Sequence, residues 1–196
     1  MPPAIDSDAR RAAVVAAAAE LIDEGGLGAV TFRSLAARLK CSTTVISHYF
    51  RDKEEILRET YGYSVEAAIG LREKVLGRSD APLPQALEET LPLGVEQRRI
   101  WRVWLCFWTA ALFDPNMAEV HKQGLAGTRL RLENWYLAQG WGGAKAKLAS
   151  ERMGEALYGI AMQALFDPGY WTAGRQRQAW RRALENAQSL EAPSGK

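Results

Sequence analysis

The fold of this chain is decided by residues 31–57, which read TFRSLAARLKCSTTVISHYFRDKEEIL. Thr31 and Ser42 are residues that often begin helices, and apolar side chains follow each of them at intervals of three and four. Asp52 begins a third helix, and Glu55 three residues later completes a capping box. Two short helices joined by a tight turn, the second with a small and polar outer face, are typical of a helix-turn-helix. An ordinary helical hairpin has the same shape, so charge and side-chain size must decide between them.

Residues 31–53 carry a local positive charge. They contain five basic side chains and one acid, Asp52, which gives a net charge of +4, whereas the whole chain carries only +2. A local positive patch is what phosphate binding requires. The outward side chains of the second helix are small or hydrogen-bonding, so this helix could lie close to base edges in a major groove. The candidate base contacts are Thr43, Thr44, Ser47 and His48, and the candidate phosphate contacts are Tyr49 and Lys53, with Arg33 in the same basic patch.

The same stretch resembles the DNA-binding region of TetR-type transcriptional repressors. The resemblance rests on Leu35-Ala36, Ser42, the quartet Ser47-His48-Tyr49-Phe50 and Lys53-Glu54. The sequence departs from the family at Lys40, because the family usually has glycine in this turn. A residue with a Cβ that is held at positive φ costs roughly 1 kcal/mol.

No stretch shows the alternation of period two that marks a strand, so the fold is predicted to be all-α, with about nine helices, a number that the resemblance also implies. The predicted helices cover residues 7–23, 31–39, 42–50, 52–76, 85–91, 97–113, 117–139, 147–166 and 172–189, with Ser7 capping the first. They form a helix-turn-helix DNA-binding domain (1–57) and a larger effector-binding and dimerisation domain (58–190), followed by a flexible tail (191–196). The helix over 52–76 is the covalent link between the domains and the expected lever between them.

The composition argues against several other classes of function. The two cysteines, Cys41 and Cys106, lie far apart without metal-ligand spacing, so no disulfide, metal site or cofactor is expected. The two histidines, His48 and His121, belong to no catalytic motif, and His121 is expected on the surface, so an enzyme is not expected. The longest apolar run, 103–113, is too short to span a bilayer, and no signal peptide is visible. We therefore expect a cytoplasmic protein with no membrane partner.

All seven tryptophans follow residue 100, and Trp101, Trp104 and Trp108 share one helix face. Core packing explains such a stripe, and a pocket with aromatic walls is the alternative. Further walls of such a pocket would come from Trp135, Tyr136, Tyr158 and Phe166, with Asp114, Glu133 and Asp167 as nearby acids. Aromatic faces together with a carboxylate suit a quaternary ammonium group, which has no hydrogen to donate.

Two segments of the C-terminal half, 91–112 (LPLGVEQRRIWRVWLCFWTAAL) and 164–176 (ALFDPGYWTAGRQ), resemble the BetI-like, choline-sensing branch of the same family. This resemblance implies that the effector is choline or another quaternary or small cationic amine.

We interpret the chain as a homodimeric repressor that binds a pseudo-palindromic operator in double-stranded DNA and loses affinity for it when effector binds. The rival interpretation is a small-molecule sensor or carrier without specific DNA binding. The dimer is predicted through two apolar stripes near the C-terminus, formed by Leu157, Ile160 and Ala164 and by Trp180, Leu184 and Ala187. The alternative is that these stripes close the core of a single chain.

Overall fold

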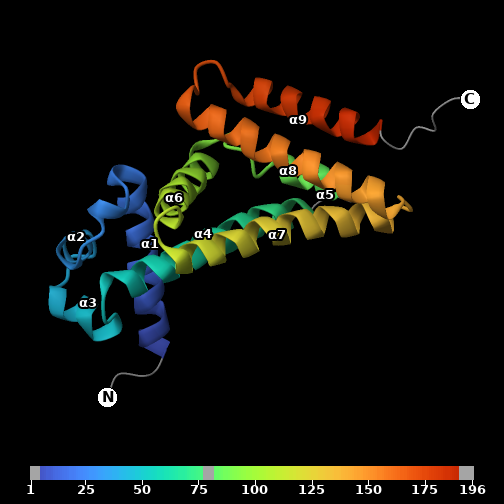
Figure 1. Ribbon diagram of the computed structural model, residues 1–196. Helices are drawn as coiled ribbons and strands as arrows, with labels where there is room; N and C mark the ends of the chain where they lie inside the picture. Colours follow the sequence, from blue (N-terminus) through green and yellow to red (C-terminus); the bar gives the residue numbers. More distant parts are fainter. Residues whose placement is uncertain (1–4, 77–81, 190–196) are drawn as a thin grey trace, which may run out of the picture.

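Nine α-helices and one short 3-10 turn make up residues 5–76 and 82–189, the ranges that the computed structural model describes (Figure 1). The helices are α1 (Ile5–Gly25), α2 (Phe32–Arg38), α3 (Thr43–Tyr49), α4 (Lys53–Leu76), α5 (Leu83–Glu88), α6 (Val95–Ala111), α7 (Pro115–Ala138), α8 (Gly143–Phe166) and α9 (Ala173–Gln188), and the turn is η1 (Leu27–Ala29). These two ranges contain no strand, so the prediction of an all-α fold is confirmed. The predicted tail, 191–196, lies outside the described residues.

Helices α1, α2, α3 and the start of α4 pack around one apolar core. Each contributes a side chain that is at most 1% exposed, namely Ile22, Leu35, Ile46 and Ile56. Burial of this kind contributes about 1.5–3 kcal/mol for each large aliphatic side chain. The two short helices of the helix-turn-helix are therefore held by tertiary packing, since helices of seven residues are not stable alone.

Helix α6 belongs to two cores at once. Val103 and Phe107, each 1% exposed, pack with the N-terminal helices. Trp101, 2% exposed, packs into the C-terminal core with side chains of α7, α8 and α9. Arg99, Arg102 and Thr109 lie on the exposed face of this helix, so α6 buries two apolar sides and keeps one polar side at the surface. The domains are therefore joined by the packing of α6 as well as by the continuous helix α4.

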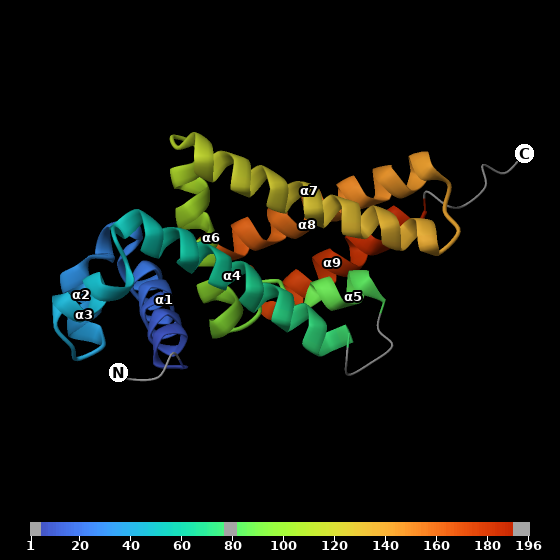
Figure 2. The same cartoon turned by 90° about the horizontal axis from the view of Figure 1, so that it is seen from below.

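The long helices α7, α8 and α9 lie side by side with α8 in the middle in both views (Figures 1 and 2). The two apolar stripes near the C-terminus meet within this layer. Their members are all buried in the single chain: Leu157, Ile160, Ala164, Trp180, Leu184 and Ala187. The prediction that these six residues form a dimer interface is therefore wrong. The stripes close the core of one chain, because α8 and α9 turn them toward each other and toward α5 and α7.

Five helices begin before their predicted starts: α1, α5, α6 and α7 by two residues and α8 by four. Helix α1 begins at Ile5, so Ser7 lies inside the helix and does not cap it. Helix α8 begins at Gly143, before the predicted residue 147, because Gly142 takes the N-cap position with an extended backbone.

The reciprocal capping box lies at the start of α2, not of α4. Thr31 accepts a hydrogen bond from the Ser34 N–H, and the Ser34 hydroxyl accepts one from the Thr31 N–H. At α4, Asp52 accepts from the Glu55 N–H at 2.7 Å, as a cap does. The Glu55 carboxylate instead accepts from the backbone N–H of Arg51, so the predicted box is only half formed.

The turn between α2 and α3 places Lys40 at a φ of 52°, in the left-handed region. This conformation costs roughly 1 kcal/mol for a residue that has a Cβ. The N–H of Cys41 donates to the carbonyl of Ala36 at 3.0 Å and closes the end of α2. The turn therefore keeps the geometry that glycine usually supplies, in spite of the lysine.

Candidate functional site

The outward face of α3 holds four of the predicted DNA contacts, Thr43, Thr44, Ser47 and His48, all of which are exposed. The opposite face is anchored by Ile46, which is 0% exposed. Because an α-helix repeats every 3.6 residues, anchoring one face fixes the direction of the other. The structure thus leaves a short helix with small polar side chains free to approach another molecule.

The other predicted DNA contacts flank this face. Arg33 is exposed on α2, whereas Tyr49 and Lys53 are half-buried at the end of α3 and the start of α4. The rings of His48 and Tyr49 meet edge to face, with centroids 5.0 Å apart. Lys53 is the first residue of α4, where backbone N–H groups without helical partners favour an anion.

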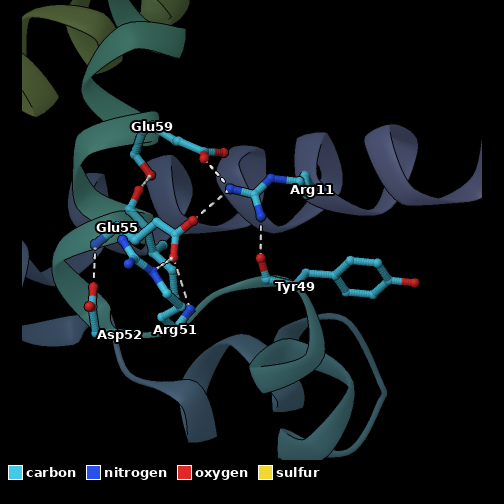
Figure 3. Close-up of polar contacts among 8 residues, drawn as sticks. Arg11, Tyr49, Arg51, Asp52, Glu55 and Glu59 are labelled. Atoms are coloured by element: carbon cyan, nitrogen blue, oxygen red, sulfur yellow. Dashed lines mark hydrogen bonds and ion pairs between the residues drawn. The ribbon is translucent and has the colours of Figure 1, made fainter.

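A polar cluster joins α1, the end of α3 and the start of α4 (Figure 3). Arg11 of α1 donates to the backbone carbonyl of Tyr49 and to the carboxylates of Glu55 and Glu59. Glu55 also accepts from Arg51, through its backbone N–H at 2.9 Å and its side chain at 3.3 Å. The Arg51 N–H and the Arg11 guanidinium lower the pKa of Glu55 from 4.5 to about 2.

The shifted pKa of Glu55 predicts a pH-dependent contribution to stability. Because the folded-state pKa is depressed, the Glu55 carboxylate stabilises the protein above pH 4.5, and this contribution is lost as the pH falls toward about 2. Glu55→Gln should therefore be less stable than the wild type at pH 7, and the difference should shrink between pH 4.5 and 2. Urea unfolding of both proteins across this range measures it. A difference that stays constant with pH would show that the charge of Glu55 is not what stabilises the cluster.

A cavity of about 180 Å³ lies in the C-terminal half, between α4, α6, α7 and α8. Its aromatic wall comes from α6 and α8, where the Trp101 ring lies 5.2 Å from Trp104, 5.8 Å from Trp108 and 5.9 Å from Tyr158 between centroids. These four residues were predicted from the sequence as pocket walls, and the structure brings them together around one cavity. Trp101 is fixed there by its indole N–H, which donates to the carbonyl of Thr90 at 2.6 Å.

Three other predicted ligand contacts do not line this cavity. Tyr136, 1% exposed, is packed between Trp135 and Trp141 in the core, where burial raises its pKa to about 12. Phe166 is 73% exposed at the end of α8. Trp135 and Tyr136 lie beyond the cavity on α7, and Phe166 lies more than two turns beyond Tyr158 on α8.

The predicted acids do not line the cavity either, and two of them complete helix ends. Asp114 caps α7 by accepting from the N–H groups of Asn116 and Met117. Asp167 accepts from the N–H of Tyr170 at 3.0 Å after α8. The lining residues within the described ranges include Arg131 and His121 but no carboxylate.

Two further rings of the cavity lining, Tyr61 and His121, were not predicted as ligand contacts from the sequence. The prediction of a surface position for His121 is wrong, because it is half-buried with its ring centroid 4.8 Å from that of Trp108. Burial lowers the pKa of His121 from its ordinary value, which favours the uncharged imidazole. Nothing in the spacing of α7 marks this residue, since its partner Trp108 lies on another helix.

A helix-turn-helix with an exposed second helix, joined to a larger helical domain that encloses a cavity, defines a helix-turn-helix transcriptional regulator. The chain belongs to the TetR family of bacterial regulatory proteins, and within it to the BetI type. Residues 14–60 match the model described as "Bacterial regulatory proteins, tetR family", and residues 80–188, more than half of the chain, match "BetI-type transcriptional repressor, C-terminal". The family consists of transcriptional regulators, not enzymes.

Relatives of known sequence and structure agree with this assignment. The transcriptional regulator BetI of Burkholderia cenocepacia is 30% identical over 182 residues, which cover 89% of this chain and 86% of that protein. BetI of Burkholderia mallei is 31% identical over 179 residues with the same coverage. Among solved structures, a transcriptional regulator from Rhodococcus sp. Rha1 has a TM-score of 0.81 at 22% identity over 91% of this chain and 96% of its own. A regulator from Saccharomonospora viridis, solved in complex with choline, has a TM-score of 0.77 at 22% identity and the same coverage.

Membrane-spanning helices and metal-binding groups are both absent from residues 5–76 and 82–189. No helix there combines the length and the apolar content needed to cross a membrane. No group of His, Cys, Asp or Glu side chains in that part of the chain could hold a metal ion.

Proposed function

We propose that this protein is a cytoplasmic, non-enzymatic repressor whose operator affinity falls when a small molecule fills the cavity in the C-terminal domain. One observation carries the proposal: the helices that wall the cavity also hold the DNA-binding domain. Tyr61 and Val65 of α4 line the cavity, and the same helix begins four residues after the last residue of α3. A ligand that moves α4 therefore acts on the helix that follows the DNA-binding face.

Helix α6 provides the second connection. Trp104 and Trp108 line the cavity, while Val103 and Phe107 on the same helix pack into the N-terminal core. Arg102 adds a bidentate ion pair with Asp23 of α1, with N–O distances of 2.6 and 3.1 Å. A shift of α6 on ligand binding would therefore also displace α1, because the packing of the N-terminal core and the Arg102–Asp23 ion pair connect the two helices. Such two-site coupling typically amounts to roughly 1–3 kcal/mol, or 5- to 150-fold in affinity.

A second copy of the chain completes the proposed regulator. Two recognition helices held about 34–36 Å apart match successive major grooves of a pseudo-palindromic operator. Because the predicted stripes are used inside one chain, we place the homodimer contact on the outer surface of α8 and the turn that follows it. Phe166 and Tyr170, 73% and 57% exposed, lie there as large side chains that the single chain leaves mostly open, with Arg175 stacked on the Tyr170 ring at 4.1 Å.

The proposed effector is a quaternary or other small cationic amine such as choline. Ring faces of tryptophan and tyrosine attract such a cation by roughly 0.5–2 kcal/mol for each ring. Trp104, Trp108 and Tyr158 supply the rings, burial favours the uncharged form of His121, and the guanidinium of Arg131 is the positive charge among the described lining residues that a bound cation would have to avoid. Since the described lining residues include no carboxylate, the rings would hold the cation without an ion pair. The similar regulator from Saccharomonospora viridis, solved with choline, supports this choice of ligand.

We place Thr43, Thr44, Ser47 and His48 against bases, and Arg33, Tyr49 and Lys53 against phosphates. Lys53→Ala should then weaken binding to all duplexes and lower the slope of log affinity against log salt by about one, because one phosphate contact is lost. Ser47→Ala is the matched variant, and it should instead change the ranking of related duplexes at an unchanged salt slope. Fluorescence-anisotropy titrations at several salt concentrations measure both. If the two variants lose affinity in the same way, the assignment of roles is wrong.

Selection of duplexes from a random library, followed by gel-shift titration, separates this proposal from a sensor or carrier without specific DNA binding. A repressor should prefer its selected duplex over random DNA by about 10³-fold or more. Equal affinity for every duplex would favour the sensor or carrier.

A further inference from the structure

Arg11 lies on α1, outside the helix-turn-helix, yet it contacts three parts of the DNA-binding domain (Figure 3). One terminal nitrogen donates to the backbone carbonyl of Tyr49, the last residue of α3. The other terminal nitrogen donates to Glu59 and, at 2.9 Å, to Glu55, both on α4. The guanidinium carbon also lies 4.3 Å from the centroid of the Phe50 ring, which is 1% exposed between the two helices.

The carbonyl of Tyr49 is a natural acceptor for this side chain. The last carbonyls of a helix have no partner within the helix, and a positive charge near them interacts favourably with the helix dipole. Arg11 supplies both a donor and the charge. Its contact is to the backbone, so it fixes where α3 ends whatever side chain occupies position 49.

The two glutamates tie the same guanidinium to α4. Glu55 is itself held by the backbone N–H of Arg51, between α3 and α4, and its lowered pKa keeps it charged. Arg11 therefore contacts the end of α3, the residues that connect α3 to α4, and the first two turns of α4. A planar guanidinium has several N–H donors in fixed directions, so it can bind these acceptors at the same time, whereas a lysine ammonium can bind only some of them.

We propose that Arg11 is a positioning residue for operator recognition, which sets the direction of α3 relative to α4. This inference rests on the proposed function. Arg11 is half-buried and paired with two carboxylates, so it is not itself a phosphate contact. A misdirected recognition helix loses base contacts, whereas the basic surface that attracts any DNA remains.

Arg11→Gln should therefore lower affinity for the selected operator about 10- to 100-fold, as expected for the loss of charged hydrogen bonds. Affinity for random duplex should stay within about twofold, and the salt slope for random DNA should not change. Arg11→Lys should restore part of the operator affinity, because it keeps the charge and one or two of the contacts. Amide hydrogen exchange of α3 should rise in Arg11→Gln and fall again in Arg11→Lys.

Two further variants control for folding and for the loss of an ion pair. Glu59→Gln removes only the ion pair between Arg11 and Glu59. It should give a smaller loss of operator preference in a protein with unchanged circular dichroism. Arg177→Gln removes an arginine of α9 that pairs with Glu88 at 3.1 Å and Glu89 at 3.2 Å, far from α3, and should leave operator affinity unchanged.

The experiment is a titration of wild type and these variants with selected operator and random duplex at two salt concentrations. Selective loss of operator affinity in Arg11→Gln, with partial rescue by Arg11→Lys, supports the inference. Full operator preference in Arg11→Gln, or an equal loss on both duplexes, overturns it. A wild type with no preference for any duplex overturns the proposed function itself, and the inference with it.

Discussion

Trp180→Ala should lower the free energy of unfolding by about 3–5 kcal/mol, as truncations of large buried aromatic residues do. Trp180 is 0% exposed in the core that α9 shares with α5 and α8. Its indole N–H also donates to the carbonyl of Pro84 at 2.9 Å, which ties α9 to α5. Truncation would leave both a cavity and a buried carbonyl without its donor. Urea unfolding at a fixed protein concentration measures the loss, since association of two chains adds to apparent stability.

Trp180→Phe separates the two contributions. Phenylalanine keeps most of the apolar volume but not the N–H, so the expected loss is about 1–3 kcal/mol, the cost of an unsatisfied buried group. A Trp180→Ala protein that unfolds like the wild type but no longer dimerises would contradict this account. That outcome would instead mean that Trp180 belongs to the dimer interface predicted from the sequence.

Trp108→Ala should weaken choline binding about 10- to 30-fold, the upper range for removal of one desolvated ring from a cation. Trp108 is central to the aromatic wall, with its centroid 5.8 Å from Trp101, 5.5 Å from Tyr158 and 4.8 Å from His121. Its loss therefore removes one face and frees its neighbours to move. Isothermal titration calorimetry measures the affinity, and Trp108→Phe should weaken it only modestly because a ring remains.

Trp135→Ala and an uncharged ligand complete the test. Trp135 does not line the cavity, so its truncation should leave choline affinity nearly unchanged. The isostere 3,3-dimethylbutanol has the shape of choline without its charge and should bind more weakly to the wild type. Equal affinity for the two ligands would mean that the cavity selects shape and apolar area, and that the rings are not used to hold a cation.

Local patterns in the sequence were sufficient for the helix-turn-helix. The predicted helices 31–39 and 42–50 contain α2 and α3, and the unusual lysine of the turn indeed takes a positive φ. These features depend on contacts only a few residues apart in sequence, which spacing and capping residues report directly. The tryptophan face of α6 could be predicted for the same reason, because it depends only on three residues of one helix.

Features that depend on distant segments were not predictable in this way. The periodicity of α8 and α9 identifies apolar faces but does not say whether the same chain or a second copy covers them, which is why Leu157 and Trp180 were assigned to an interface. The position of His121 depends on how α7 packs against α6. The contacts of Arg11 join residues 38 to 48 positions apart and have no local pattern.

Operator binding with and without choline shows whether an effector in the cavity releases the DNA. The selected duplex is titrated with wild-type protein in the absence of choline and at a choline concentration that calorimetry shows to be saturating. We expect the dissociation constant for the operator to rise by about 5- to 150-fold, while binding to random duplex is little changed. An operator affinity that stays the same or increases when choline occupies the cavity would contradict it.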